Sequence, residues 1–246
     1  MAGPTNQGRL ACSAPRVVAA AGIRHAVVDG AVVILDLRRG TYHVLDRVAS
    51  AMWDPLVRGA GDDDDVLRTI LAQFAVDANR ARRDLAAFRE RCLADGLLAV
   101  RTTGEPPPAY QRPVAPKRVV WPAFAAWRCL AGTALLLRRG GFATAYRVST
   151  SLAPAPRGAA ADGALDRALA AFARAENFFV PRRAPDDCLP RSLALFRFLR
   201  MMGLPAEHVI GCRRAPFFAH AWVECGGRVV LDDDHRAELT ALARAA

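Results

Sequence analysis

Three residues near the C-terminus carry the side chains of a thiol-based catalytic site. Cys188 follows two aspartates at the predicted start of a helix, where the positive end of the helix dipole favours the thiolate over the thiol. His220 lies in a predicted strand, which would hold its imidazole as rigidly as a general base requires. Asp232 ends the next predicted strand, where a carboxylate could orient the imidazole and stabilise its cation. These residue types predict nucleophilic attack by a cysteine thiolate.

The length of one turn decides which acid faces His220. A two-residue turn, Gly226-Gly227, would pair His220 with Asp233. A three-residue loop over 225–227 would pair His220 with Asp232 and would place opposite charges across the strands. We expect the longer loop, because its last residue is a glycine that tolerates positive φ. Asp232 is therefore the predicted acid, and Asp233 is the alternative.

Two other interpretations of these residues stay open. A free cysteine is commonly a buried core residue, and a histidine in a strand can be satisfied by ordinary hydrogen bonds. A zinc site is the chemical alternative, but its candidate soft ligands lack CxxC spacing, so no metal or other cofactor is expected. These candidate ligands are Cys188, His208, Cys212, His220 and Cys225.

The elements around these residues predict an α+β fold. Four helices come first, and the period of the apolar residues then changes from helical to two. The predicted helices cover residues 122–139, 141–152, 165–179 and 188–202, and the predicted antiparallel strands cover 208–212, 219–224 and 228–232.

The N-terminal half shows another set of short strands and helices. Asp29-Gly30 signals a tight hairpin, Asp46 and Asp77 cap helices, and four aspartates from Asp62 open a further helix. A proline-rich segment interrupts the pattern, because proline lacks an amide hydrogen and fixes φ. We therefore expect a flexible N-terminus (1–20), a first domain (21–101), a linker (102–117) and a second domain (118–246).

Composition favours a globular, cytoplasmic protein. The chain has 246 residues, of which 52% are hydrophobic, and no apolar run is long enough for a membrane span. The N-terminus lacks the pattern of a signal peptide. The net charge of +10 falls mainly on residues 106–246, with 20 basic and 11 acidic residues. No basic stripe with interleaved aromatics appears, so we expect a solvated basic surface and no nucleic-acid partner.

The C-terminal residues resemble the protease domain of lasso-peptide biosynthesis B proteins, which belong to the transglutaminase-like cysteine proteases. The resemblance covers about 120–246 and is most specific from 188 to 232, in the stretches beginning Cys188-Leu-Pro-Arg and Pro216-Phe-Phe-Ala-His and in Val229-Val-Leu-Asp232. It implies Cys188 as nucleophile, His220 as base and Asp232 as the residue that orients it. Leu231 departs from the family pattern, since a polar residue is expected before the acid.

The N-terminal half is similar to the small winged-helix recognition element related to the pyrroloquinoline-quinone biosynthesis chaperone. The similarity rests on Thr41-Tyr-His-Val-Leu-Asp46, Trp53, Gly59 and the segment from Asp77 to Leu98. Such domains add a leader peptide as a strand beside their sheet, next to the third helix. The predicted leader-binding residues are Thr41, Tyr42 and Val44 on the edge strand, with Arg82 and Arg89 flanking the groove.

Together these resemblances imply a leader peptidase of lasso-peptide biosynthesis. Its partners would be the leader region of a precursor peptide and an ATP-dependent macrolactam synthetase, which closes the released core. A transglutaminase-type acyltransferase would use the same thioester with an amine acceptor. A DNA-binding winged-helix protein is the non-enzymatic alternative, which the arginines of the third helix make conceivable and which salt-dependent duplex binding would support.

Overall fold

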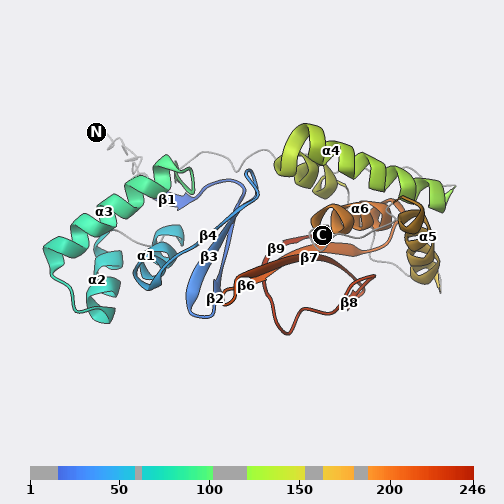
Figure 1. Cartoon of the computed structure of the whole chain (residues 1–246). Coiled ribbons are helices and arrows are strands. Elements are labelled where there is room, and N and C mark those ends of the chain that lie inside the picture. Colours follow the sequence, from blue (N-terminus) through green and yellow to red (C-terminus); the bar gives the residue numbers. More distant parts are fainter. Residues whose placement is uncertain (1–15, 59–62, 102–120, 153–162, 180–187) are drawn as a thin grey trace, which may run out of the picture. The chain divides into compact units, whose positions relative to one another are not determined.

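The computed structural model of the chain describes residues 16–58, 63–101, 121–152, 163–179 and 188–246 (Figure 1). Helices and antiparallel sheets make up these ranges, which confirms the α+β class. Their contacts define two compact units. The first unit comprises residues 1–21 and 48–109, and the second comprises 22–47 and 110–246. The expected linker at 102–117 lies outside the described residues, so the domain boundaries stay a prediction.

A two-stranded sheet in the first unit joins the two ends of its sequence. Strand β1 (Arg16–Ala19) pairs antiparallel with β5 (Leu98–Arg101), and the backbone N–H of Ala20 donates to Leu97. The prediction of a flexible segment over 1–20 is therefore wrong for residues 16–19. Two consecutive valines in β1 suit an extended strand, and the partner strand satisfies their backbone groups.

Three helices complete the first unit: α1 (Arg47–Val57), α2 (Asp63–Gln73) and α3 (Ala78–Ala94). The Asp77 carboxylate caps α3, where it accepts from the backbone N–H groups of Asn79 (3.0 Å) and Arg80 (3.1 Å). Acidic residues also occupy the first turn of α2, as the helix dipole favours. These features confirm the predicted helix starts.

The second unit begins with a three-stranded sheet in the order β2-β3-β4, formed by Ile23–Val28, Ala31–Asp36 and Thr41–Val44. Asp29 and Gly30 connect the first two strands with φ of 48° and 75°, as the predicted tight hairpin requires. All six residues of the central strand β3 are buried. Strand β4 lies at an edge, because no other described strand pairs with its outer side.

Three helices and a four-stranded sheet form the rest of the second unit. Helices α4 (Pro122–Thr150), α5 (Ala164–Phe179) and α6 (Cys188–Met201) pack together, and their shared core includes Phe172, Phe196 and Phe198. Gly141 has φ 67° and ψ −175° and breaks α4, which confirms two helices at the predicted positions.

The four-stranded sheet has the order β8-β7-β6-β9 and packs against these helices (Figure 1). Its strands are β6 (Ala206–Arg213), β7 (Phe218–Cys225), β8 (Arg228–Val229) and β9 (Thr240–Ala245). Strand β9 was not predicted. The helix-facing side of the sheet contributes residues such as Ala206 and Val223 to the core, while Val209 and Trp222 pack with Leu239 on the other side.

The hairpin between β7 and β8 has a different register from the predicted one. Cys225 pairs with Arg228 and Glu224 with Val229, so the turn contains only Gly226 and Gly227. Both glycines have positive φ, 61° and 77°, the conformation of a two-residue type I′ turn. The expected three-residue loop is therefore wrong, because the sequence supplies two consecutive residues that tolerate this conformation.

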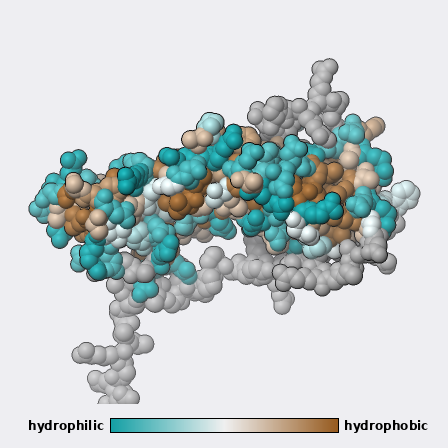
Figure 2. All heavy atoms as spheres, turned by 90° about the horizontal axis from the view of Figure 1, so that it is seen from below, coloured by the Kyte–Doolittle hydropathy of each residue, from teal (hydrophilic) through white to brown (hydrophobic). Residues whose placement is uncertain are grey.

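The described surface carries hydrophilic residues that separate smaller apolar patches on the face shown in Figure 2. Within the described ranges, no helix combines the length and the apolar character needed to cross a membrane.

Candidate active site and peptide-binding edge

Cys188 is the first residue of α6, and it is partly exposed. The next turns anchor the helix, because Leu193 is fully buried and Ser192 Oγ lies 3.0 Å from His208 Nε2 in strand β6. Burial by itself raises the pKa of the Cys188 thiol. The hydrogen bond with His220 and the backbone N–H groups of Ala221 and Leu189 lower this pKa, and their sum leaves it below the ordinary value. Asp186 and Asp187, one of which was expected to cap the helix, lie outside the described residues.

His220 occupies the middle of strand β7 between two aromatic rings. The rings of Phe218 and Trp222 are nearly parallel to the imidazole, with centroids 6.1 Å and 6.3 Å away. Alternate residues of a strand lie on one face, so the three rings form a stack that restricts the orientation of His220. The hydrogen bonds with Asp232 and then with Cys188 raise the pKa of His220 to about 9, against the effect of burial.

Asp232 contacts His220 although it lies outside the β7–β8 ladder. His220 Nε2 and Asp232 Oδ2 are 3.0 Å apart. Strand β8 ends at Val229, and Leu231 has φ 55°, which interrupts the extended backbone just before the acid. The predicted strand over 228–232 is thus too long, yet the structure brings the predicted acid to the predicted histidine.

The carboxylate of Asp232 is held in its charged form. Burial raises its pKa, but the hydrogen bond from His220, the backbone N–H of Asp233 and the charge of Arg191 outweigh burial and lower the pKa. The alternative acid, Asp233, is exposed. Asp234 forms an exposed ion pair with Arg236. Of these three acids, Asp232 is the one that hydrogen-bonds the imidazole of His220.

Arg191, Glu176 and His235 complete the surroundings of the site and were not predicted. Arg191 lies one turn after Cys188 on α6, pairs with the buried Glu176 of α5 (2.5 Å), and stands 3.9 Å from Asp232. Its spacing of three residues from Cys188 on one helix was the signal that could have identified it. The ring of His235 approaches that of His220 at 4.8 Å between centroids, and no sequence pattern indicated this contact.

The soft ligands considered for zinc do not assemble. Cys212 and Cys225 are buried, and burial raises the pKa of each thiol. His208 is fully buried and faces Ser192. Within the described ranges, the group of side chains close enough to hold a metal ion consists of His220, Asp232 and His235.

At the free edge of β4, the backbone N–H and C=O groups of two predicted leader-binding residues, Tyr42 and Val44, face away from the sheet. Leu45 N–H donates to Val32, and the bonded positions of an antiparallel pair alternate along the strand. The backbone groups of Tyr42 and Val44 therefore face away from β3, whereas those of Thr41 face toward it. The side chain of Val44 is also accessible to a ligand, because the residue is 48% exposed.

Tyr42 also links this edge strand to the Cys188 region of the second unit. Its ring meets Phe217 edge-on with centroids 5.4 Å apart, and it packs in the same apolar cluster as Cys188 and Ala219. Burial first, and then the nearby thiols of Cys212 and Cys188, raise the pKa of Tyr42 to about 12. The phenol therefore stays neutral at physiological pH.

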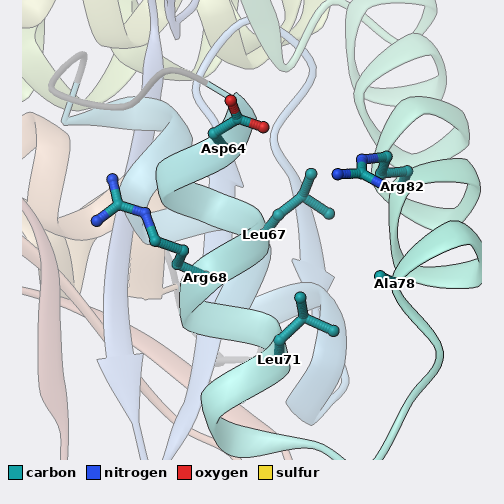
Figure 3. Close-up of a pocket in the computed structure, with 6 residues that line it drawn as sticks. All are labelled: Asp64, Leu67, Arg68, Leu71, Ala78 and Arg82. Carbon is teal, nitrogen blue, oxygen red and sulfur yellow. The ribbon is translucent and has the colours of Figure 1, made fainter.

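The two predicted arginines of α3 differ in their surroundings. Arg82 is exposed and lines a pocket between α2 and α3, into which Leu67 and Leu71 also project (Figure 3). Arg89 instead donates to both carboxylate oxygens of Asp63, at 2.9 Å and 2.7 Å. Arg82 is thus available to a ligand within the first unit, while the guanidinium of Arg89 bridges two helices.

Segments in both halves of the chain match known family models. Residues 31–98 match the family model described as Coenzyme PQQ synthesis protein D (PqqD). Residues 128–244 match that of the Transglutaminase-like superfamily.

Two further proteins are similar to parts of this chain. The Microcin J25-processing protein McjB of Escherichia coli is 50% identical over 46 residues, 19% of this chain and 22% of McjB, so the match spans about a fifth of that relative. The solved structure "TbiB1 in Complex with the TbiA(beta) Leader Peptide" is 29% identical and covers 37% of this chain and 99% of that one, with a TM-score of 0.31. A match to the PqqD model and a match to the transglutaminase-like model thus lie in one sequence, the combination that the resemblance to lasso-peptide biosynthesis B proteins implies.

Proposed function

We propose that this protein binds the leader region of a ribosomally made precursor peptide and cleaves the leader from the core as a cysteine peptidase. The observation that carries the proposal is the connected series Cys188, His220 and Asp232, in which a helix-start thiol and a carboxylate both bond one imidazole. The names of the relatives support a peptide substrate, since one processes a microcin and the other is described with a leader peptide.

We assign a separate role to each ring nitrogen of His220. Asp232 occupies Nε2 at 3.0 Å, which leaves Nδ1 to exchange a proton with Cys188. The lowered pKa of Cys188 and the raised pKa of His220 favour a thiolate beside an imidazolium. Asp232, kept ionised, stabilises that imidazolium and fixes the ring.

Cleavage then follows in two steps. The thiolate of Cys188 attacks the scissile carbonyl, and His220 donates its proton to the leaving amine, which frees the core. Water, deprotonated by His220, hydrolyses the thioester, releases the leader as its acid and regenerates the thiol–imidazole pair. The backbone N–H of Cys188 at the start of α6 supplies one donor to the oxyanion. No metal or organic cofactor takes part.

Leader capture is assigned to strand addition along β4, in a recognition domain of winged-helix type. The outward backbone groups of Tyr42 and Val44 would bond the incoming strand, and Thr41 would border it. Arg82 and Arg89 of the first unit stay proposed leader-binding residues. A neighbouring ATP-dependent macrolactam synthetase would receive the core amine, and we propose that the two enzymes associate.

Incubation with a precursor peptide that carries a leader and a core tests the proposal. Mass spectrometry should show two products whose summed mass exceeds that of the precursor by one water. Products in which an amine replaces water would identify an acyltransferase. An intact precursor that binds without cleavage would contradict the peptidase assignment, provided that the Cys188 thiol still reacts with an alkylating agent.

A further inference from the structure

Three side chains lie together at the edge of the catalytic site, and the peptidase mechanism uses only two of them. His220 and Asp232 take part in catalysis, but His235 does not. One ligand atom from each of the three residues lies within 4.8 Å of the others. The two imidazole rings meet at 72° with their centroids 4.8 Å apart, and His220 Nε2 is 3.0 Å from Asp232 Oδ2.

These donors match the preferences of a zinc-type cation. Zinc binds imidazole nitrogen and carboxylate oxygen at about 2.0–2.2 Å, so two ligand atoms on a tetrahedral ion stand roughly 3.4 Å apart. His220 and Asp232 already have nearly this separation, and the ligand atom of His235 lies within 4.8 Å of both. All three residues are partly exposed, which leaves solvent access and a fourth position for water.

We propose that His220, Asp232 and His235 form a binding site for Zn²⁺ or a similar divalent transition metal, and that the bound metal inhibits the enzyme. The site differs from the cysteine-based zinc site considered from the sequence, because Cys212 and Cys225 are buried in the core and take no part. The metal is an inhibitor, and catalysis does not need it.

Inhibition follows from the protonation of imidazole, and this consequence rests on the proposed peptidase function. A metal bound at Nε2 replaces the hydrogen bond to Asp232 and occupies that lone pair. The ring proton of neutral His220 must then reside on Nδ1, the nitrogen that the proposed mechanism leaves for Cys188. With both nitrogens occupied, His220 cannot accept the thiol proton, so the reactive ion pair does not form.

A binding titration tests the site without any reference to catalysis. The full-length Cys188→Ala variant is freed of metal with a chelator and titrated with zinc sulfate against a chromogenic zinc indicator. We expect one equivalent to bind, and we expect His235→Ala in the same background to weaken affinity about tenfold or more. His25→Ala removes an exposed histidine of β2 and serves as the matched control, which should bind like its parent. Thermal melting checks the folding of each variant.

Two outcomes of this titration would overturn the site. Unchanged affinity after His235→Ala would show that His235 is not a ligand. Loss of binding in Cys188→Ala relative to the unsubstituted chain would show that the thiolate holds the metal.

Inhibition is measured separately as cleavage of the precursor. Zinc should stop cleavage and a chelator should restore it. His235→Ala should cleave at the original rate without metal, yet require about tenfold more zinc for half inhibition. Equal zinc sensitivity of the two proteins would refute the inhibitory mechanism. Absence of cleavage in metal-free protein would instead refute the peptidase function and would leave the binding result standing.

Discussion

His220 and Asp232 are hydrogen-bonded at 3.0 Å although the ladder of β7 and β8 does not pair them. Continued by four residues along each strand, the observed register would place Asp233 opposite His220. The left-handed backbone at Leu231 (φ 55°) interrupts this alternation and turns Asp232 toward the imidazole. The predicted acid therefore bonds His220, but the backbone conformation at Leu231 brings it there and not the predicted strand register.

Replacement of the three consecutive aspartates separates their roles. Asp232→Asn should lower single-turnover cleavage on the order of 10²-fold, because an amide cannot stabilise the imidazolium of His220. Asp233→Asn and Asp234→Asn should retain cleavage, since the first residue is exposed and the second pairs with Arg236. Each variant is checked by thermal melting. If Asp233→Asn lost cleavage and Asp232→Asn kept it, the ladder register and not the Leu231 backbone would determine which acid bonds His220.

The conformation of Leu231 can be tested with side chains of similar volume. Leu231→Ile should reduce cleavage roughly tenfold, because β-branched residues are strongly disfavoured at positive φ. Leu231→Met is unbranched, fills similar space and should stay close to the original rate. Single-turnover kinetics for both proteins are compared with their melting temperatures. Equal activity of the two variants would argue against a left-handed backbone at this position.

Removal of the Cys188 sulfur should separate cleavage from leader binding. Cys188→Ala should show no cleavage by mass spectrometry and should bind a fluorescent leader peptide with unchanged affinity, since binding is assigned to β4. Cys212→Ala and Cys225→Ala are the matched controls, because these thiols are buried and lie outside the proposed catalytic triad. Both controls should remain active, with lower melting temperatures from lost packing. Cleavage by Cys188→Ala would eliminate the thiolate mechanism.

The free edge of β4 can be altered at a single backbone donor. Val44→Pro removes an N–H that faces away from β3, and leader affinity should fall about five- to tenfold for the loss of about 1 kcal/mol. Val44→Ala keeps the N–H and should bind nearly as well as the original chain. Fluorescence anisotropy with a labelled leader gives both affinities. If alanine weakened binding as much as proline, the side chain and not strand addition would account for the effect.

Buried His208 should make stability dependent on pH. Burial lowers the pKa of His208 from 6.5 to about 3 in the folded chain. Above pH 6.5 the histidine is neutral in both states, and stability is complete. As pH falls below 6.5, only the unfolded chain takes up the proton, so the free energy of unfolding decreases, by about 2 kcal/mol at pH 5.

Denaturant unfolding at pH 7 and pH 5 measures this effect. His208→Gln should be less stable than the original chain at pH 7, because it loses packing. Its free energy of unfolding should, however, decrease less than that of the original chain between pH 7 and pH 5. His25→Gln, at an exposed position, should keep the original dependence on pH. A dependence that is identical in His208→Gln and the original chain would contradict a neutral buried His208.

Several local features were predictable because neighbouring residues determine them. The Asp77 cap, the Asp29-Gly30 hairpin and the break in α4 at Gly141 each depend on residue types that suit one backbone conformation. The same reasoning failed where two local solutions competed, as in the Gly226-Gly227 turn. It also missed β1 and β9, since short strands acquire their stability from partners distant in the sequence.

The sequence by itself determined the chemistry available to this protein: a cysteine at a helix start, a histidine in a strand and an acid after the following strand, next to motifs of a leader-recognition domain. Only the tertiary structure decided how these groups meet. A left-handed leucine is unfavourable locally, and Leu231 adopts it where its side chain packs against the core of the second unit. Arg191 of α6 lies near the carboxylate of Asp232, and the ring of His235 contacts the imidazole of His220. The spacing along α6 places Arg191 near Cys188, but the contacts with Asp232 and His220 depend on how separate elements pack.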